Sequence, residues 1–479
     1  MKIVDLPVFI RNAIDNVRNI DDDVEPLEKI DESLTPNMRA LRLVMSISEQ
    51  LLAQGVPASD IVHMAIGITS TYCKRRVHLD ISSTMFTISQ DRGDDREPLT
   101  MIRTIVLKDA NYQTIQALQS LALEIRDKHL PLDEAEKRVD DILNKPKRLS
   151  RWVIYSAGGM VSAGTVLLYN GKIEMMVLAF IVGFLVTGML RWLGRIGMTT
   201  FFSQILASLC ITLVAAGSAW ASTFFNLDIN ATLLVVSGIV LLVAGMMIVG
   251  AFQDAIDEYY ITANARLLKV AFATGGIVVG VSIGLYIATR LGISFPATPD
   301  QLTMASPQIQ YIGALVIAAA FAARNHAPLF GTIIAGSVGM LGWAVSRVMI
   351  GEGFSIIIAS GIAASFVGLM ATFVSRFWKF PSMAIIAAGI VPLVPGLSLY
   401  NGLMGIVEFP IGDPQFMYAM SLLIRAVMIG LAIAAGATFG NLIGRPVRRR
   451  FVKLYNRLPR HRLSRPNWFK RHFHKTIDK

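Results

Sequence analysis

Ten apolar stretches between Trp152 and Ile443 constrain this chain more than any other feature of its sequence. Most run for about 17–25 residues, enough for a helix rising 1.5 Å per residue to cross a hydrocarbon core about 30 Å thick. Lipid offers no partner to an unpaired backbone group, so such stretches cross it as helices. We expect spans near 152–169, 175–190, 201–222, 231–252, 268–289, 311–323, 328–346, 353–375, 383–404 and 417–443.

Composition agrees with this pattern, because 53% of the 479 residues are hydrophobic and only 16% are charged. The chain is therefore expected to be a polytopic α-helical membrane protein. The sixth stretch is short, and its boundary with the seventh depends on the turn Arg324-Asn325-His326. Ten spans are our prediction, and nine or eleven are the alternatives.

Basic residues in the short loops predict the topology, because Lys and Arg accumulate on the cytoplasmic side. With the N-terminus inside, the outside loops hold little besides Lys172, Arg290 and Arg347. Ten spans return the C-terminus to the cytoplasm. The inside loops hold Lys145, Lys147, Arg148, Arg151, Arg191, Arg195, Arg266, Lys269, Arg324, Arg376 and Lys379.

The net charge of +11 comes from the tail 445–479, which has thirteen Lys or Arg against Asp478 alone. A basic segment directly after a span is typical of contact with an anionic inner leaflet, at about 1 kcal/mol per cation. The lipid bilayer, and not a nucleic acid, is therefore the expected partner of this charge. Cys73 and Cys210 are the only cysteines, and the expectation is no disulfide framework, no metal site and no cofactor.

Two regions precede the first span. Residues 1–34 form an acidic arm with few large apolar residues, a composition that predicts disorder. Residues 35–150 predict a cytoplasmic α+β domain with an ααβββαα order. Its helices are expected from Thr35-Pro36 to Gly55 and over 59–73, 112–128 and 133–143, its strands over 77–82, 85–90 and 99–107, and a turn at 91–94.

His78 and Asp80 lie two residues apart on one predicted strand and therefore share a face. A histidine beside a carboxylate can act as an acid/base pair or as half a metal site. No nucleophile motif accompanies them, and we interpret both as structural polar residues. We expect no catalytic residue in this chain.

Charged residues at membrane depth are costly and mark functional sites. Asp254, Asp257 and Glu258 lie within about one helical turn at the end of the fourth span, followed by Asn264 and Arg266. Mutual repulsion and burial could raise the pKa of one carboxyl group, which suits proton coupling. The alternative is a solvated loop whose acids pair with Arg266 and Lys269.

The ninth span contains Pro392, Pro395 and Gly396, followed by Ser398, Tyr400 and Asn401. Two prolines three residues apart remove helix hydrogen bonds and free carbonyl groups at membrane depth. Broken helices of this kind line substrate sites in secondary transporters, while a simple proline kink is the alternative.

Arg425 in the tenth span is a further candidate, either as a carboxylate partner or as a side chain that snorkels to the surface. Two glycine series with four-residue spacing are interpreted as helix packing faces. They are Gly276, Gly280 and Gly284 in the fifth span, and Gly436, Gly440 and Gly444 in the tenth.

The fourth and ninth spans share a signature, Val243-Ala244-Gly245 in one and Val394-Pro395-Gly396 in the other. Five spans per half make the second half start on the opposite side of the membrane. The halves 151–290 and 291–444 are therefore predicted to be inverted repeats, with substrate bound at their interface.

The chain resembles the bacterial threonine/serine exporter family over nearly its whole length. The matching residues are Val77-His78-Leu79-Asp80, Glu97-Pro98-Leu99-Thr100, Lys147-Arg148 to Trp152, Asp254 to Arg266 and Val391 to Leu397. The resemblance implies an exporter of small hydroxy amino acids in the cytoplasmic membrane, driven by the membrane potential or the proton gradient. The segment Asp257 to Ala263 departs from the glycine- and serine-rich pattern of many relatives.

The expected function is export of L-threonine and L-serine with protons as the coupling ion. Some family members with separate halves are associated with dicarboxylates, so a succinate-like substrate is the nearest alternative. A membrane-anchored enzyme using His78 and Asp80, and a sensor using the N-terminal domain, are the rivals from other classes. The sequence leaves the oligomeric state open, including a homo-oligomer.

Overall fold

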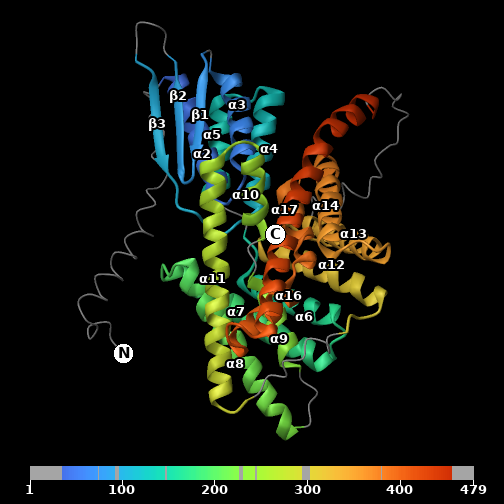
Figure 1. The fold of residues 1–479 in the computed structure, drawn as a ribbon. Coiled ribbons are helices and arrows are strands. Elements are labelled where there is room, and N and C mark those ends of the chain that lie inside the picture. The colour runs from blue at the N-terminus through green and yellow to red at the C-terminus, as the bar shows by residue number, and fades with distance from the viewer. Residues whose placement is uncertain are drawn as a thin grey trace, which may run out of the picture.

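The computed structural model of the chain describes residues 35–455 except 74, 92–96, 146–147, 226–229, 243–244, 294–302 and 379 (Figure 1). The predicted acidic arm 1–34 lies outside the described residues. So do Val243 and Ala244 of the first signature and most of the predicted turn 91–94. The predicted tail 445–479 is described only to Tyr455.

The N-terminal domain has the predicted ααβββαα order, in which strands β1, β2 and β3 form one antiparallel sheet in that order. Thr35 caps the first helix by accepting a hydrogen bond from the Met38 amide, and Gly55 ends it with a left-handed φ of 82°. The elements are α2 (Pro36–Ala53), α3 (Ala58–Tyr72), β1 (Val77–Ser82), β2 (Met85–Gln90), β3 (Leu99–Thr104), α4 (Tyr112–Lys128) and α5 (Leu132–Asn144).

The central strand carries the core of this domain. Phe86 and Ile88 on β2 are fully buried and alternate with more exposed neighbours, as expected for a sheet covered on one face. The third strand is shorter than predicted. Beyond it, the Lys108 amide donates to the Ala53 carbonyl at the end of α2, so the chain leaves the sheet before residue 107.

Helices fill the rest of the described chain, and they lie where the apolar stretches predicted them. The boundary at Arg324 is confirmed, since α12 ends there and His326 has a left-handed φ of 61°. The helices are α6 (Arg151–Leu168), α7 (Ile173–Arg195), α8 (Thr200–Phe225), α9 (Ala231–Leu242), α10 (Gly245–Ile256), α11 (Tyr260–Arg290), α12 (Pro307–Arg324), α13 (Leu329–Gly351), α14 (Ile356–Trp378), α15 (Ser382–Gly389), the 3₁₀ turn η3 (Val391–Leu393), α16 (Gly396–Glu408) and α17 (Pro414–Tyr455).

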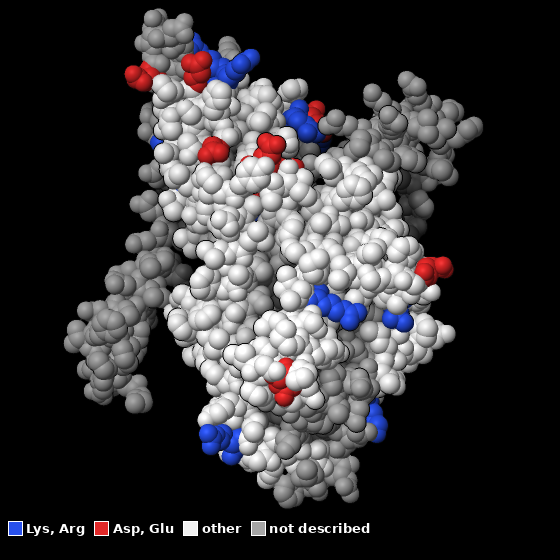
Figure 2. All heavy atoms as spheres, viewed as in Figure 1, with Lys and Arg blue, Asp and Glu red and all other residues white. Residues whose placement is uncertain are grey.

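Within the described residues, six helices are long and apolar enough to cross a membrane. Two bent pairs raise that number to eight if each pair is one span: α9 with α10, bent by 47°, and the segment from α15 to η3 with α16, bent by 52°. Helices α6 and α12 are not among them, so the count of ten stays a prediction. On the face shown in Figure 2, most of the surface below the N-terminal domain is free of charged side chains.

Helix contacts in the first half of this region have counterparts in the second half. Helix α6 packs on α7 as α12 packs on α13, and α8 packs on α11 as α14 packs on α17. The broken pairs follow the same rule, because α10 packs on α11 as α16 packs on α17. The two halves meet directly where α6 packs on α12.

Both glycine series are confirmed as packing faces. A Cβ atom on Gly280 would clash with α8 at the Ile205 carbonyl and the Ser208 hydroxyl. A Cβ atom on Gly440 would clash with α14 at the Ser365 carbonyl. Backbones come this close only where a side chain is missing, which is how small residues bring helices together in lipid.

We predict that Gly440→Ala destabilises the protein by about 1–3 kcal/mol, because the new methyl group must push α17 away from α14. Thermal unfolding of the purified protein in detergent measures the effect. Gly430→Ala is the matched control on the same helix, since nothing lies within 4 Å of its added Cβ. Equal melting temperatures for the two variants would contradict this account of the glycine face.

Candidate functional site

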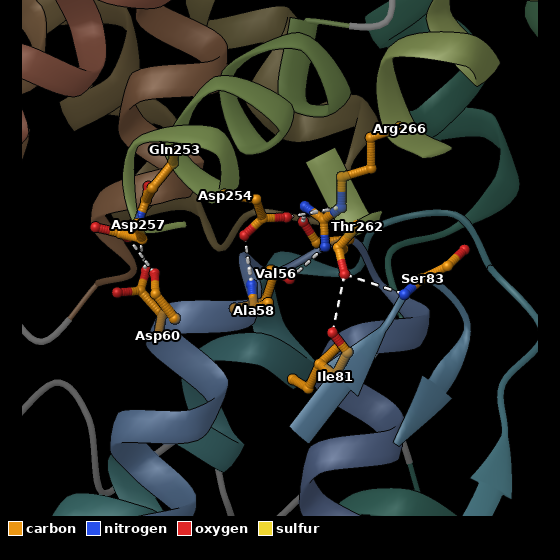
Figure 3. A network of polar contacts seen from close by, with 12 residues as sticks. Val56, Ala58, Asp60, Ile81, Ser83, Gln253, Asp254, Asp257, Thr262 and Arg266 are labelled. Carbon is orange, nitrogen blue, oxygen red and sulfur yellow. Dashed lines mark hydrogen bonds and ion pairs between the residues drawn. The ribbon is translucent and has the colours of Figure 1, made fainter. Parts of the chain in front are cut away.

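The acidic segment at the end of α10 lies against the N-terminal domain (Figure 3). The Asp254 side chain is fully buried, and its Oδ1 atom accepts a hydrogen bond of 2.7 Å from the Ala58 amide. That amide opens α3, whose N-cap residue Pro57 has no side-chain cap to offer. Asp254, from a distant part of the chain, therefore caps the N-terminus of α3. Its negative charge also interacts favourably with the positive end of the helix dipole there.

Arg266 on α11 completes this contact. Its Nε atom lies 3.2 Å from Asp254 Oδ2, and its two Nη atoms donate to the carbonyls of Gly55 and Val56 at 3.0 and 2.7 Å. Those carbonyls lie in the turn between α2 and α3, beyond the last hydrogen bonds of α2. A single guanidinium group thus joins the buried carboxylate to the backbone of the N-terminal domain.

Three more side chains of the membrane half form hydrogen bonds to the domain around this ion pair. Asp257 accepts a hydrogen bond from the Ser59 hydroxyl, and the Gln253 amide donates to Asp60 at 3.2 Å. Thr262 on α11 accepts from the Ser83 amide at 3.0 Å and donates to the Ile81 carbonyl at 3.1 Å, which ties β1 to the membrane half. We call these contacts and the Asp254–Arg266 pair the docking contact.

Only some residues of the predicted acidic site take part in the docking contact. Glu258 and Asn264 are exposed, and Glu258 lies in a left-handed turn with a φ of 70°. Asp254 and Asp257 turn to different partners on α3. The predicted pairing with Arg266 is confirmed for Asp254, but the segment is not a solvated loop. Asp254 and Asp257 serve the contact between the domain and α10, which neither alternative included.

The break in the fourth span leaves two helical carbonyls that side chains satisfy. Arg324 donates to the Leu241 carbonyl at 2.8 Å, and the Gln204 amide donates to the Leu242 carbonyl at 3.4 Å. Within the described residues, the Gln204 Oε1 atom is buried without a hydrogen-bond partner. The sequence marks Arg324 as a loop charge and a span boundary, and no local pattern points to Gln204.

The break in the ninth span is built as predicted from its prolines. Pro392 lies in the buried turn η3, and Pro395 precedes Gly396, the first residue of α16. Tyr400 is 2% exposed, while Ser398 and Asn401 are half-buried. The Gly396 amide donates to the Val394 carbonyl at 2.9 Å, and the next two amides lie in the first turn of α16, where the helix itself offers them no carbonyl.

The two breaks lie next to each other in the fold. Helix α9 packs on α16, and α10 packs on α15. A Cβ atom on Gly396 would stand 2.9 Å from the Val240 side chain, so the start of α16 touches the last turn of α9. The Arg425 side chain is exposed.

A cavity of about 2150 Å³ lies between the N-terminal domain and the membrane half. It reaches the first break, where Gln204, Leu242 and Met247 line it together with Thr187 and Ser203. This size exceeds that of a pocket for one small molecule, commonly about 300–1,000 Å³. We call this cavity the vestibule; it leads from the domain junction to the first break, between α9 and α10.

The turn between α12 and α13 forms a second contact with the domain. The Tyr112 amide donates to the Asn325 carbonyl at 3.0 Å, and the Tyr112 ring stands edge-on to Phe380 with centroids 6.5 Å apart. His326 accepts a hydrogen bond from the Leu149 amide at its Nδ1 atom. Burial, with the positive charges of Arg191 and Arg148, lowers the pKa of His326 to about 4.

The rival chemistry on β1 gains no support from the structure. His78 and Asp80 are both exposed, and Asp80 accepts a hydrogen bond from Ser82 at 3.2 Å. The part of the chain that is described holds no group of three His, Cys, Asp or Glu side chains that could bind a metal ion.

Comparison with known proteins identifies relatives over most of the chain. The family model described as "Putative threonine/serine exporter" matches residues 42–288, and the model "Threonine/Serine exporter, ThrE" matches residues 310–443. A threonine/serine exporter of Corynebacterium glutamicum is 28% identical over 427 residues, covering 88% of this chain and 86% of the relative. A Mycobacterium tuberculosis protein described as "Probable threonine/serine exporter" is 28% identical over 417 residues, covering 86% and 77%. No solved structure matches the chain.

We predict that Arg266→Met releases the N-terminal domain, because it leaves the buried Asp254 carboxylate without its cation. Breaking a buried pair from one side costs about 3–5 kcal/mol. Hydrogen exchange should show loss of protection at the Ala58 amide, which Asp254 holds. Arg425→Met removes an exposed arginine and serves as the control; unchanged protection at Ala58 in Arg266→Met would refute the docking contact.

The lowered pKa of His326 predicts an acid-sensitive junction. An unfolded histidine titrates near 6.5, so the stability that neutral His326 contributes is complete above that pH and is lost as the pH falls toward 4. Between pH 7.5 and 5 the loss should be about 2 kcal/mol. His326→Asn should reduce this pH dependence of the melting temperature, whereas His63→Asn, at an exposed position, should not.

Proposed function

Because the chain belongs to the threonine/serine exporter family, we propose that it exports L-threonine and L-serine across the cytoplasmic membrane by secondary active transport driven by the proton motive force. Family membership makes it a multi-pass membrane transporter and not an enzyme. The single observation that carries the mechanism is the contact between two broken helices deep in the bundle, the first of which lines the vestibule.

The proposed architecture is ten spans arranged as two inverted repeats. The matching contacts of α6–α11 and α12–α17 support the repeat, and five spans per unit give the two units opposite directions. The N-terminal domain contacts the α10–α11 and α12–α13 turns, which supports assigning both turns to its side of the membrane. The basic loops favour the cytoplasm for that side and for both termini.

We place the substrate at the crossing of the two breaks. The start of α16 is the positive end of a helix dipole, and the end of α9 beside it is a negative end. The carboxylate of a zwitterionic amino acid suits the start of α16. At the end of α9, the Leu241 and Leu242 carbonyls already accept from Arg324 and Gln204. Ser398 and Asn401 are half-buried near the start of α16 and are the proposed partners of the substrate hydroxyl group.

Proton coupling is assigned to Asp254. Protonation would remove the charge that both Arg266 and the Ala58 amide bind, and would weaken the docking contact. The N-terminal domain would then open the vestibule on its own side. One charge moved through 100 mV supplies about 2.3 kcal/mol, which supports a concentration ratio in the tens.

A transport assay tests the function. Proteoliposomes loaded with labelled threonine, serine or succinate should release the two amino acids when a proton gradient is imposed. Release of succinate alone would refute the substrate proposal, and equal rates with and without the gradient would refute the coupling.

Asp254→Asn should cut gradient-driven threonine release at least about tenfold, because the amide keeps the acceptor for Ala58 but cannot change its charge. Glu258→Gln is the matched control, since it removes one carboxylate from the same segment at an exposed position. Wild-type gradient dependence in Asp254→Asn would remove this residue from coupling.

A further inference from the structure

On the side of the vestibule that is formed by the membrane half, the charged side chains of the described residues are all positive, and we call this side the basic wall. Among the described residues that line the vestibule, those from position 148 onward include six Lys or Arg and no Asp or Glu. They come from separate elements: the approach to α6, the end of α7, the start of α11 and the end of α12. The six are Arg148, Arg191, Arg195, Arg266, Lys269 and Arg324.

Most of this charge is not neutralised within the described part of the protein. Arg266 is paired with Asp254, and Arg324 donates to the Leu241 carbonyl. The other four form no ion pair with a described residue. The N-terminal domain lines the rest of the cavity with charges of both signs. Its acids are Glu49, Asp109, Asp133, Glu136 and Asp140, and its basic residues include Lys108. Asp109 is the acid whose charge acts on Lys269, Arg324 and His326 together.

Ordinary explanations account for only part of this arrangement. Basic residues in loops fix the orientation of a membrane protein, but that role does not require their side chains to line the same cavity. Cations at the ends of α7 and α12 complement the helix dipoles, yet each dipole end amounts to about half a charge. Threonine and serine have no net charge, so bound substrate leaves the wall as positive as before. A ligand with at least two negative charges matches it.

The depth of this wall relative to the membrane surface indicates which ligands can reach it. Trp152 and Trp192 are 70% and 59% exposed, and Trp192 follows Arg191 directly. Exposed tryptophans mark the level of the lipid headgroups. The wall therefore lies where it can meet a phosphate group of the cytosol or of a lipid.

We propose that this wall binds a phosphate group at the junction between the N-terminal domain and the membrane half. Guanidinium groups reaching in from several elements suit a tetrahedral phosphate with three acceptor oxygens better than one planar carboxylate. A phosphate monoester carries about −1.5 to −2 charges, which offsets more than half of the charge of +3 on Arg191, Arg195 and Lys269. Bound phosphate, held also by Lys108, strengthens the docking of the domain.

Inorganic pyrophosphate is the probe for the soluble source. The full-length protein is placed in nanodiscs of phosphatidylcholine, and its melting temperature is followed at constant ionic strength set with chloride. Pyrophosphate should raise the melting temperature until the site is saturated, while threonine and succinate at equal concentration should leave the melting temperature unchanged. A second set of nanodiscs with phosphatidylglycerol tests the lipid source: there the rise should appear without pyrophosphate.

In the double variant Arg191→Gln with Lys269→Gln, the pyrophosphate concentration that gives half of the full rise in melting temperature should be at least tenfold higher. Arg425→Gln, outside the cavity, should leave that concentration unchanged. If that double variant does not fold, Arg195→Gln with Lys269→Gln replaces it, because Arg195 is exposed. The proposal is overturned if neither phosphate source stabilises the protein, or if the folded variant responds like the wild type. Threonine transport is measured separately, so failure here leaves the export proposal standing.

Discussion

The buried pair of Asp254 and Arg266 is the interaction on which the rest of the molecule depends. A carboxylate with no exposed surface is stable only while its cation and its hydrogen-bond donor stay in place. Here the donor is the first amide of α3, and the cation also holds the turn between α2 and α3. The pair therefore fixes the N-terminal domain over the vestibule, and the shape of that cavity follows from it.

The second constraint is close helix packing around the breaks. Lipid provides no hydrophobic force between helices, so the glycine faces of α11 and α17 let backbones touch those of α8 and α14. These two tightly packed pairs hold the frame in which α9 with α10 and α15 with α16 interrupt their hydrogen bonding. Arg324 and Gln204 satisfy the carbonyls exposed by the first interruption. The interrupted helix is therefore tolerated for two reasons: the helix pairs around it are tightly packed, and polar side chains bind its free carbonyls.

Much of this architecture could be predicted from local patterns. The strands 77–82 and 85–90 and the helix 112–128 match their predicted bounds, since alternation and helical spacing are local signals. The break at Pro392 and Pro395 was predicted because proline removes a backbone donor wherever it lies. The prediction for β3 was too long, because a hydrogen bond from Lys108 to Ala53 draws the chain away from the sheet. No local pattern reports a contact of that kind.

The sequence by itself determined that the chain is a membrane protein with a small α+β domain, two interrupted helices and glycine packing faces. Apolar length, proline chemistry and residue size settle those properties within one segment at a time. Only the tertiary structure decided what the buried charges do. Asp254 lies 196 positions from Ala58, and Arg324 lies 83 positions from Leu241. Partners so far apart are chosen by the packing of whole elements, because a buried charge is stable only where folding brings a matching group to it.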